Sequence, residues 1–531
     1  MNTEQLIDYL CQPDSYPHPV GVVTTIETHI SVVFLTGQYA YKLKKPVDFG
    51  FLNFTNKTER KHFCEQELRL NRRTAPNLYI DVVPIFVSTH DGINVASTSP
   101  YNSSECSEPL DYLVKMHQFD PNCVLGRYLL EHKVTPEQER EVAQQIAQLH
   151  LTSERISAAS LLGEPEAVLQ PMLDNFPTLI THCSEDYKPR LRALLAWTEQ
   201  HFLELRPLLA ERKKSGFIRE CHGDLHLDNI ALINEQPTLF DGIEFNETFR
   251  WIDGLNDLAF LLIDLDFREQ QHFKRRLLSD YLAITGDYKG VALLSFYRVY
   301  RSLVRAKISA LRLSQLNETS IDFHHYKQIT MQYIHQAEAT AFKPTTPQLI
   351  LLQGVSGSGK SHLSKQLLQQ IDAVVISSDI ERKRLFGIQS TERVSNSQKQ
   401  RLYSPQLSQQ TYQHLQVLAD QLLSFGVSVI VDATFLKAQH RQPFYELAKN
   451  RGLKCKTLYI EVKEQADVQT VKQSIEQRLH LNSDPSDADV AVMLNQLKVI
   501  EPPTLTETAL TLKASALRRF FPSNLTQDFL L

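Results

Sequence analysis

Alternating apolar and polar positions dominate the chain from Val20 to about Pro84. The runs THISVVFLTG and QYAYKLKKP, which meet after Gly37, are rich in β-branched and aromatic residues and predict a β-hairpin. In the run TERKHFCEQELRLNRRTAP, apolar residues then recur among charged ones and predict a helix that stops before Pro76. With the strand-like runs LYIDVVPIFVS and LDYLVKMHQF, these elements predict a small β-rich lobe at about 20–115.

Helical spacing takes over from about Pro136. In TPEQEREVAQQIAQLH, Thr135 is a predicted N-cap, Pro136 occupies the first helical position, and acids follow in the first turn. Helical patterns continue to about Ala341, except for the strand–loop–strand pattern of CHGDLHLDNIALINEQPTLFDGIEF. We therefore predict a helical lobe at about 120–340, which makes residues 1–340 an α+β bilobal domain.

The pattern changes again after the polar segment AFKPTTPQ, which contains two prolines and ends at Gln348. The short apolar runs LILLQG, AVVISSD, VSVIVDAT and TLYIEV alternate there with helical segments. This alternation predicts a parallel sheet covered by helices. We assign residues 341–348 to a linker and residues 349–531 to a second, α/β domain.

The composition fits a globular protein of two or three domains, since the 531 residues are 42% hydrophobic and 22% charged. The formal net charge of −5 makes nucleic acid an unexpected partner. MNTEQLIDYL lacks the basic start and apolar core of a signal peptide, and no apolar segment is long enough to predict a membrane span. The seven cysteines form no C-x-x-C pair, so neither a zinc site nor a disulfide framework is predicted. We expect a cytoplasmic protein.

The segment LILLQGVSGSGKS is an apolar strand that runs into the pattern G-x-x-x-x-G-K-S and then into the helical run HLSKQLLQQI. In this pattern, backbone N–H groups of the loop and the N-terminus of the helix bind phosphate oxygens. Lys360 is predicted to reach the β- and γ-phosphates of a nucleotide, and the Ser361 hydroxyl is predicted to bind Mg²⁺. The predicted nucleotide-binding residues are Gly354, Val355, Ser356, Gly357, Ser358, Gly359, Lys360 and Ser361.

Two further segments place acids at the ends of predicted strands. VSVIVDAT has Asp432 at the carboxyl end of its apolar run, where a carboxylate for magnesium is needed. ISSDIERKRLFG has Asp379 after another strand, with Arg382 one turn later. Asp379 is a candidate base for an attacking hydroxyl and Arg382 a candidate phosphate contact. The alternative role of Asp379 is a helix N-cap.

This D-x-x-R pattern after the second strand resembles that of the P-loop kinases of small molecules and of polynucleotide 5′ ends. In that family a mobile lid carries arginines over the phosphates, and IEQRLHLNSDPSDADV offers Arg478 for this role. The alternative for Arg478 is a solvated arginine on a helix.

HGDLHLDN is a second, unrelated signature of phosphoryl transfer. Its Asp224 and Asn229 are spaced as in the catalytic loop of kinases, where an acid orients the acceptor hydroxyl and an asparagine holds magnesium. Asp241 follows in TLFDGIEF, after a strand-like run, where the second magnesium carboxylate is expected. His222 is predicted to brace the loop and not to act as a base.

Upstream, YAYKLKK stands where kinases carry a phosphate-binding lysine, so Lys42 is the candidate. Lys44 lies on the same face of the predicted strand and stays an alternative, because strand side chains alternate. On the following helix, Glu67 or Glu65 is expected to pair with that lysine.

These residues resemble the aminoglycoside phosphotransferase and choline kinase branch of the kinase-like fold, over about residues 20–330 and best at HGDLHLDN. In place of the basic residues of a protein-kinase catalytic loop stand Gly223 and His226, and only a short segment follows Asp241 before the next predicted helix. No G-x-G-x-x-G precedes Lys42, as is often the case in that branch. The resemblance implies ATP and Mg²⁺ as cofactors and a small hydroxylated acceptor as the partner.

The whole chain resembles a bacterial family in which such a domain is fused to a P-loop ATPase or kinase domain. We therefore predict an ATP- and Mg²⁺-dependent phosphotransferase with two nucleotide sites that phosphorylates small hydroxylated molecules. Two alternatives stay open. Either one domain catalyses and the other is an ATP-binding sensor, or the C-terminal domain is a nucleic-acid 5′-end kinase. The sequence indicates neither the acceptor, nor the choice between ATP and GTP, nor the oligomeric state.

Overall fold

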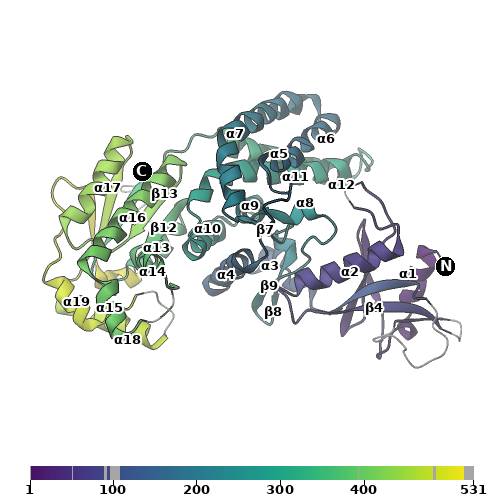
Figure 1. Cartoon of the computed structure of the whole chain (residues 1–531), viewed down its shortest axis with the longest axis horizontal. Coiled ribbons are helices and arrows are strands. Elements are labelled where there is room, and N and C mark those ends of the chain that lie inside the picture. Colours follow the sequence, from purple (N-terminus) through teal and green to yellow (C-terminus); the bar gives the residue numbers. More distant parts are fainter. Residues whose placement is uncertain are drawn as a thin grey trace. The chain divides into compact units, whose positions relative to one another are not determined.

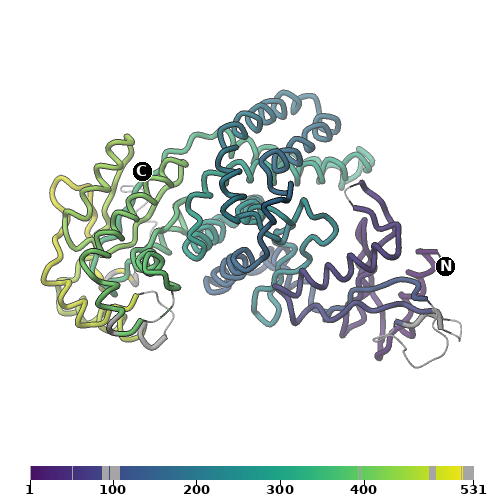
Figure 2. The backbone as a smooth tube through the Cα atoms, viewed as in Figure 1, coloured from purple at the N-terminus to yellow at the C-terminus, as the bar shows by residue number. Residues whose placement is uncertain are grey.

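The computed structural model describes residues 2–50, 52–88, 92–95, 108–390, 392, 394–481 and 486–519. The chain divides by its contacts into two compact units. Unit 1 comprises Met1–Asp264 and Phe296–Ala337, and unit 2 comprises Leu265–Ser295 and Glu338–Leu531. Figure 1 labels many of the helices and strands, and Figure 2 traces the backbone. Within the described ranges, every helix is too short or too polar to cross a membrane.

An antiparallel sheet forms the small lobe of unit 1, in the order β1-β2-β3-β6-β4-β5. The predicted hairpin is confirmed, because β2 pairs with β3 and Gly37 lies between them at a φ of +92°, a conformation that favours glycine. The strands are β1 (Thr24–Glu27), β2 (Ser31–Leu35), β3 (Tyr39–Lys44), β4 (Tyr79–Ser88), β5 (Gly92–Val95) and β6 (Asp111–His117).

One helix covers each face of this sheet. Helix α1 (Thr3–Leu10) packs with the apolar side chains of β2 and with Tyr41 and Leu43 of β3. Helix α2 (Lys57–Asn71) packs against β4 and β6, and Figure 1 shows it lying along the sheet. Because strand side chains alternate, the even-numbered residues of β3 point to the side of α2. The two lysines of YAYKLKK therefore lie on the helix side of the sheet.

The rest of unit 1 is mainly helical and carries two short antiparallel ribbons. The predicted start of α4 is confirmed, with Thr135 in a capping box and Pro136 at the first helical position. The helices are α3 (Leu125–Glu131), α4 (Pro136–Thr152), α5 (Pro165–Leu173), α6 (Asn175–His182), α7 (Lys188–Lys214), α8 (Glu247–Arg250), α9 (Gly254–Phe267), α11 (Leu294–Leu313) and α12 (Ile321–Phe342). The ribbons pair β7 (Ile218–Glu220) with β10 (Trp251–Asp253), and β8 (Ile230–Ile233) with β9 (Gln236–Leu239).

Unit 2 is built on a parallel sheet in the order β12-β13-β11-β14-β15, which confirms the predicted α/β class. The strands are β11 (Leu349–Gln353), β12 (Ala373–Ser377), β13 (Ser428–Asp432), β14 (Cys455–Glu461) and β15 (Ala509–Lys513). The helices are α10 (Gln271–Thr285), α13 (Lys360–Leu368), α14 (Ser378–Phe386), α15 (Asn396–Leu402), α16 (Pro405–Ser424), α17 (Ala438–Asn450), α18 (Gln465–Leu481) and α19 (Val490–Leu497). The central β11 is buried along its whole length, as its apolar run predicts.

Helix α10 lies far from the rest of unit 2 in sequence but packs against β12, an outer strand of its sheet. The backbone N–H of Val375 donates to Ser279 Oγ (3.1 Å), and Arg275 contacts the Asp372 carboxylate (2.6 Å) and the Gln369 carbonyl oxygen (2.8 Å). An outer strand exposes unpaired backbone groups, and α10 covers some of those of β12. Residues 265–295 therefore complete the sheet domain, an arrangement that the pattern of the sequence did not indicate.

Candidate active sites

In unit 1, the loop HGDLHLDN follows β7 and ends in a short 3-10 turn at Leu227–Asn229. It brings two of the predicted residues together, because Asn229 Nδ2 donates to the carbonyl oxygen of Asp224 (2.9 Å) and to its Oδ2 (3.1 Å). His226 Nε2 lies 3.2 Å from the same Oδ2. Burial raises the pKa of Asp224, but the neighbouring His226 outweighs it and holds that pKa below its ordinary value. The carboxylate is thus ionised and ready to accept a hydrogen bond.

Acids of helix α9 hold this loop in place. Asp257 accepts from the backbone N–H groups of His222 (2.9 Å) and Gly223 (2.9 Å), and Asp264 accepts from that of Leu227 (2.9 Å). Sequence reasoning missed these two positioning residues. The available signal was two acids inside the apolar run DLAFLLIDLDF, because a buried carboxylate needs hydrogen-bond donors.

Other side chains packed at the start of the loop also support its backbone. His150 Nε2 lies 3.1 Å from Asp257, and Cys221 is close enough for the three to form a metal-sized cluster. Both oxygens of Asp257 already accept backbone N–H groups, which favours a structural role for this cluster. His222 donates from Nε2 to the Phe240 carbonyl oxygen (2.9 Å), in line with the predicted bracing role.

Glu67 of α2 is shared by both candidate lysines of β3. Its Oε1 lies 2.9 Å from Lys42 Nζ, and its Oε2 lies 2.6 Å from Lys44 Nζ. The two lysines then diverge, since Lys42 also contacts Asp241 Oδ1 (2.6 Å), whereas Lys44 contacts Glu244. The Lys44 side chain is 1% exposed and that of Lys42 is 12% exposed, so Lys42 is the lysine nearer to solvent.

The open choice between the two glutamates is decided by geometry. Glu65 lies on the exposed side of α2, where it pairs with Lys61 (3.7 Å) and with no other charged residue of the described ranges. Glu67 is fully buried, which raises its pKa, but Lys42 and Lys44 outweigh burial and lower that pKa to about 2. Glu244 was not a candidate from sequence, although it follows Asp241 in TLFDGIEF.

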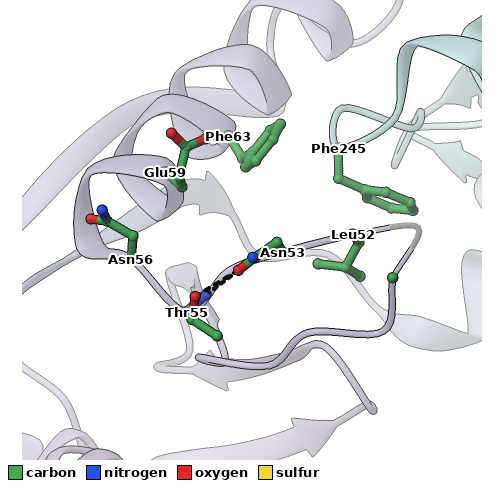
Figure 3. A pocket seen from close by; sticks show the side chains of 8 residues that line it. Leu52, Asn53, Thr55, Asn56, Glu59, Phe63 and Phe245 are labelled. Carbon is green, nitrogen blue, oxygen red and sulfur yellow. Dashed lines mark hydrogen bonds between the residues drawn. The ribbon is translucent and has the colours of Figure 1, made fainter.

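A pocket of about 520 Å³ borders this network. It is lined by the loop before α2, by Glu59 and Phe63 of α2, and by Phe245, as Figure 3 shows. Phe54 connects the pocket to the lysines, because its ring lies 5.1 Å from Lys44 Nζ and 6.3 Å from the ring of Phe245. The ring of Phe54 therefore connects the pocket residue Phe245 to Lys44 of the Lys44–Glu244 pair.

In unit 2, the predicted phosphate loop joins β11 to α13. Lys360 Nζ donates to the carbonyl oxygens of Gly354 (3.0 Å) and Val355 (3.0 Å), so the lysine lies within its own loop. Ser361 Oγ donates to Asp432 Oδ2 (2.7 Å), which brings the two predicted magnesium residues of this unit together. A Cβ at Gly357, whose φ is +77°, would lie 2.4 Å from the side chain of Ile475, so glycine is needed there.

A residue that sequence reasoning missed reaches the same loop. The backbone N–H of Ser356 donates to Gln496 Oε1 of helix α19 (2.7 Å). An N–H group of a phosphate loop is a natural donor to a phosphate oxygen, and here a side-chain amide accepts it. No motif links the two residues, which are 140 positions apart.

Asp379 and Arg382 are placed on helix α14, directly after β12. Ser377 is the N-cap of this helix, so the N-cap role for Asp379 was wrong. The Arg382 guanidinium is buried, where its Nη1 donates to Ser408 Oγ (3.0 Å) and the Leu402 carbonyl oxygen (3.4 Å). It thus ties α14 to neighbouring helices of the unit. Arg478 lies in α18, and its side chain falls outside the described residues.

Between these two candidates stands Glu381, which is fully buried. It accepts from Tyr288 Oη (3.0 Å) in the segment after α10, and from Arg384 Nε (3.1 Å). Arg384 also donates to the Ala283 carbonyl oxygen at the end of α10 (2.5 Å). Helix α14 is therefore fixed by residues 265–295, from a distant part of the sequence.

Comparison with known families agrees with both geometries. Residues 98–294 match the sequence model of a phosphotransferase enzyme family, and residues 349–503 match that of an AAA domain. The chain joins a phosphotransferase-family domain to a P-loop domain. The phosphotransferase match runs on through α10, which by its contacts is part of unit 2.

Relatives align with most of this chain, and solved structures align with parts of it. The proteins named uncharacterized protein Rv2004c of Mycobacterium tuberculosis and uncharacterized protein Mb2027c of Mycobacterium bovis are each 29% identical over 482 residues, which is 90% of this chain and 91% of the relative. A choline/ethanolamine kinase family protein from Mesorhizobium loti is 12% identical with a TM-score of 0.36 and covers 64% of this chain and 95% of its own. A putative kinase from Chloroflexus aurantiacus is 20% identical with a TM-score of 0.28 and covers 34% and 93%.

The family matches make the protein a phosphotransferase of the kinase type. The phosphotransferase-family match begins after β3, the strand that carries both lysines, and after Glu67, so the lysine–glutamate network rests on the geometry of unit 1 alone.

Proposed function

We propose that the protein is an ATP- and Mg²⁺-dependent phosphotransferase with two nucleotide sites, each acting on a small hydroxylated acceptor. One observation carries the proposal for unit 1. Within this unit, Lys42 meets both Glu67 and Asp241, while Asp224 and Asn229 share a hydrogen bond. These are the residue types that phosphoryl transfer needs, namely a cation for the phosphates, oxygens for a metal and an acid for the acceptor.

The side chains of unit 1 fit a magnesium ion. Mg²⁺ prefers oxygen ligands, and the Asp241 carboxylate is 43% exposed and contacts Lys42 through only one of its oxygens. Asn229 uses only its Nδ2 in hydrogen bonds with other described groups, which leaves its side-chain oxygen for the metal. When bound, Mg²⁺ would neutralise phosphate charge. The exposed, singly bonded carboxylate is what distinguishes Asp241 from the buried Glu67 and Glu244.

Each side chain of unit 1 then has a defined task. Asp224 accepts the hydrogen bond of the acceptor hydroxyl and takes its proton as the hydroxyl oxygen forms a bond to the γ-phosphorus. The bond from the γ-phosphorus to the bridging oxygen breaks, and ADP leaves with that electron pair. Lys42 binds the phosphates, and Glu67 holds Lys42 in place. Positioning and charge thus supply most of the catalysis.

In unit 2 the corresponding tasks fall to different groups. The phosphate loop and Lys360 would hold the triphosphate, and Ser361 with Asp432 would hold magnesium. Asp379, at the carboxyl end of β12, is the proposed base. A second candidate function for this unit is a nucleotide sensor. Its support is the hydrogen bond between Tyr288 and Glu381, which would couple helix α14 to residues 265–295.

Two single substitutions separate these functions. Full-length protein is incubated with γ-labelled ATP and a metabolite extract, beside Asp224→Asn and Lys360→Met. If both sites catalyse, each substitution removes a different labelled product, by roughly 100-fold or more. If unit 2 is a sensor, Lys360→Met weakens ATP binding but removes no product. Labelled products that survive both substitutions would contradict the proposed function.

A further inference from the structure

Helix α11 presents two arginines, one turn apart, to the catalytic loop of unit 1. Arg301 is buried and donates to Asn256 Oδ1 through Nε (2.9 Å) and to the Gly223 carbonyl oxygen through Nη1 (3.3 Å). Gly223 immediately precedes the proposed base Asp224. Residues four apart lie on the same face of a helix, so Arg305 extends the face that Arg301 anchors to the loop.

An aromatic ring connects the same helix face to His226. The Arg301 guanidinium lies 4.8 Å from the ring centre of Phe260, and that ring meets the imidazole of His226 edge to face at 5.6 Å. His226 in turn contacts the Asp224 carboxylate. This side of the catalytic loop is therefore lined by α11 and α9.

Arg305 differs from Arg301 in how it is bonded. Its Nε donates to Tyr333 Oη at 3.4 Å, a long hydrogen bond. Its two Nη groups make no hydrogen bond or ion pair with any residue that the structure describes. The side chain is half-buried, and the charges of Asp264 and Asp224 both act on its guanidinium. Arg305 thus acts on Asp224 through space without contacting it.

The carboxylates around Arg305 have tasks of their own. Asp264 is buried and accepts the Leu227 N–H group, and Asp224 is the proposed base. A guanidinium has a planar fork of donors that matches a carboxylate or phosphate in two hydrogen bonds. The Nη donors of Arg305 are thus available for such a group.

We infer that unit 1 phosphorylates a hydroxylated anion and that Arg305 binds the carboxylate or phosphate group of that acceptor. This inference rests on the proposed function of unit 1 and names its substrate class. A cationic acceptor, such as an aminosugar or an amino alcohol, would place its ammonium group near the positive charges of two arginines. The site therefore selects against such amines.

The test uses the full chain carrying Lys360→Met, so that only unit 1 transfers phosphate. A metabolite extract is separated at neutral pH into anionic, neutral and cationic fractions, and each is incubated with γ-labelled ATP. We expect label that depends on Asp224 in the anionic fraction. Label that depends on Asp224 only in the neutral or cationic fraction overturns the inference and leaves the proposed function standing. The absence of such label in every fraction overturns both.

Substitution of the arginine then tests its role. Once the labelled acceptor is purified, Arg305→Met should raise its KM by about 10- to 100-fold, because charged hydrogen bonds are lost, while the KM for ATP stays within about twofold. Arg305→Lys keeps the charge but not the planar fork of donors, so its acceptor KM should lie between that of the parent protein and that of Arg305→Met. Arg312→Met is the matched control, because Arg312 is exposed at the end of the same helix. An unchanged acceptor KM in Arg305→Met overturns the assignment, as does an equal rise in the ATP KM.

Discussion

The lysines of the two candidate nucleotide sites are held in different ways. Lys42 of unit 1 lies between the carboxylates of Glu67 and Asp241, whereas Lys360 of unit 2 donates to two backbone carbonyl oxygens of its own loop. Unit 1 thus builds its site from charged side chains far apart in sequence. Unit 2 builds its site from the backbone of a few consecutive residues. The first site should be sensitive to changes of charge, and the second to changes of backbone conformation.

The largest effect is expected where charge is buried most deeply. Glu67→Gln leaves Lys42 and Lys44 with one fewer carboxylate where Glu67 itself is fully buried, and breaking a buried pair in this way costs about 3–5 kcal/mol. We expect the free energy of unfolding of unit 1 to fall by that order and phosphoryl transfer by unit 1 to be lost. Denaturant unfolding and the labelled-ATP assay measure the two effects.

Glu65→Gln is the matched control, because Glu65 is exposed on the same helix and makes only a long ion pair with Lys61. Glu65→Gln should change neither the free energy of unfolding of unit 1 nor its phosphoryl transfer measurably. Equal effects of the two substitutions would show that charge on α2, and not the buried network, matters for unit 1.

The second prediction concerns the backbone of unit 2. Gly357→Ala places a Cβ 2.4 Å from Ile475 at a φ of +77°, so the phosphate loop must shift. Strain of this kind costs about 1–3 kcal/mol, and we expect the affinity of unit 2 for ATP to fall at least about tenfold. ATP titration in a Lys42→Met background measures unit 2 alone.

Gly387→Ala separates the clash from the conformation. Gly387 has a similar φ of +83° at the end of α14, but a Cβ there meets nothing within 4 Å. Its ATP affinity should stay near that of the parent protein. If both alanine substitutions weaken ATP binding equally, backbone strain elsewhere in unit 2 lowers the ATP affinity as much as strain in the phosphate loop does.

The same contrast explains what could be predicted from the sequence. The phosphate loop is contiguous, so its residues and the partner Asp432 at the end of a strand could be predicted from pattern alone. The catalytic loop is also contiguous, and Asp224 and Asn229 do meet. Lys44 and Glu244, however, are 200 positions apart, and nothing in either segment indicates that they form a pair.

Helix α10 shows the same limit at the level of domains. Its sequence belongs to the phosphotransferase-family match, and its amphipathic pattern fits any helical domain. Its place in unit 2 depends on Ser279 reaching the outer strand and on Tyr288 reaching Glu381, 93 positions away. Such contacts are set by tertiary packing and leave no periodic signal in the sequence.

The third prediction uses the pH dependence of activity to distinguish the two sites. The pKa of Asp224 lies below its ordinary value because His226 outweighs burial, so Asp224 stays ionised as the pH falls towards that lowered pKa. His226→Asn removes the charge but keeps a side-chain acceptor for the Asp228 N–H group. The pKa of Asp224 should rise, and the acid limb of the kcat/KM profile of unit 1 should move to higher pH.

Unit 2 should keep its profile in this variant, since His226 belongs to unit 1 and the proposed base of unit 2, Asp379, is unchanged. His324→Asn, an exposed change on α12, is the control for unit 1 and should leave the acid limb in place. An acid limb that moves to lower pH in His226→Asn would show that His226 destabilises the ionised Asp224, which is opposite to the sign expected here.

The smallest effect is expected at Gln496, and it reverses the direction of the others. The Ser356 N–H group donates to Gln496 Oε1 at 2.7 Å, so the amide competes for a donor that a phosphate oxygen can use. One hydrogen bond of this kind contributes about 1 kcal/mol, so Gln496→Ala should raise the affinity of unit 2 for ATP by about fivefold. The titration again uses the Lys42→Met background. Asn495→Ala, at an exposed position of the same helix, should have no effect. If affinity falls in Gln496→Ala, the amide supports the phosphate loop when ATP is bound, and the backbone of unit 2 then depends on a distant side chain in the way that Lys42 depends on Glu67.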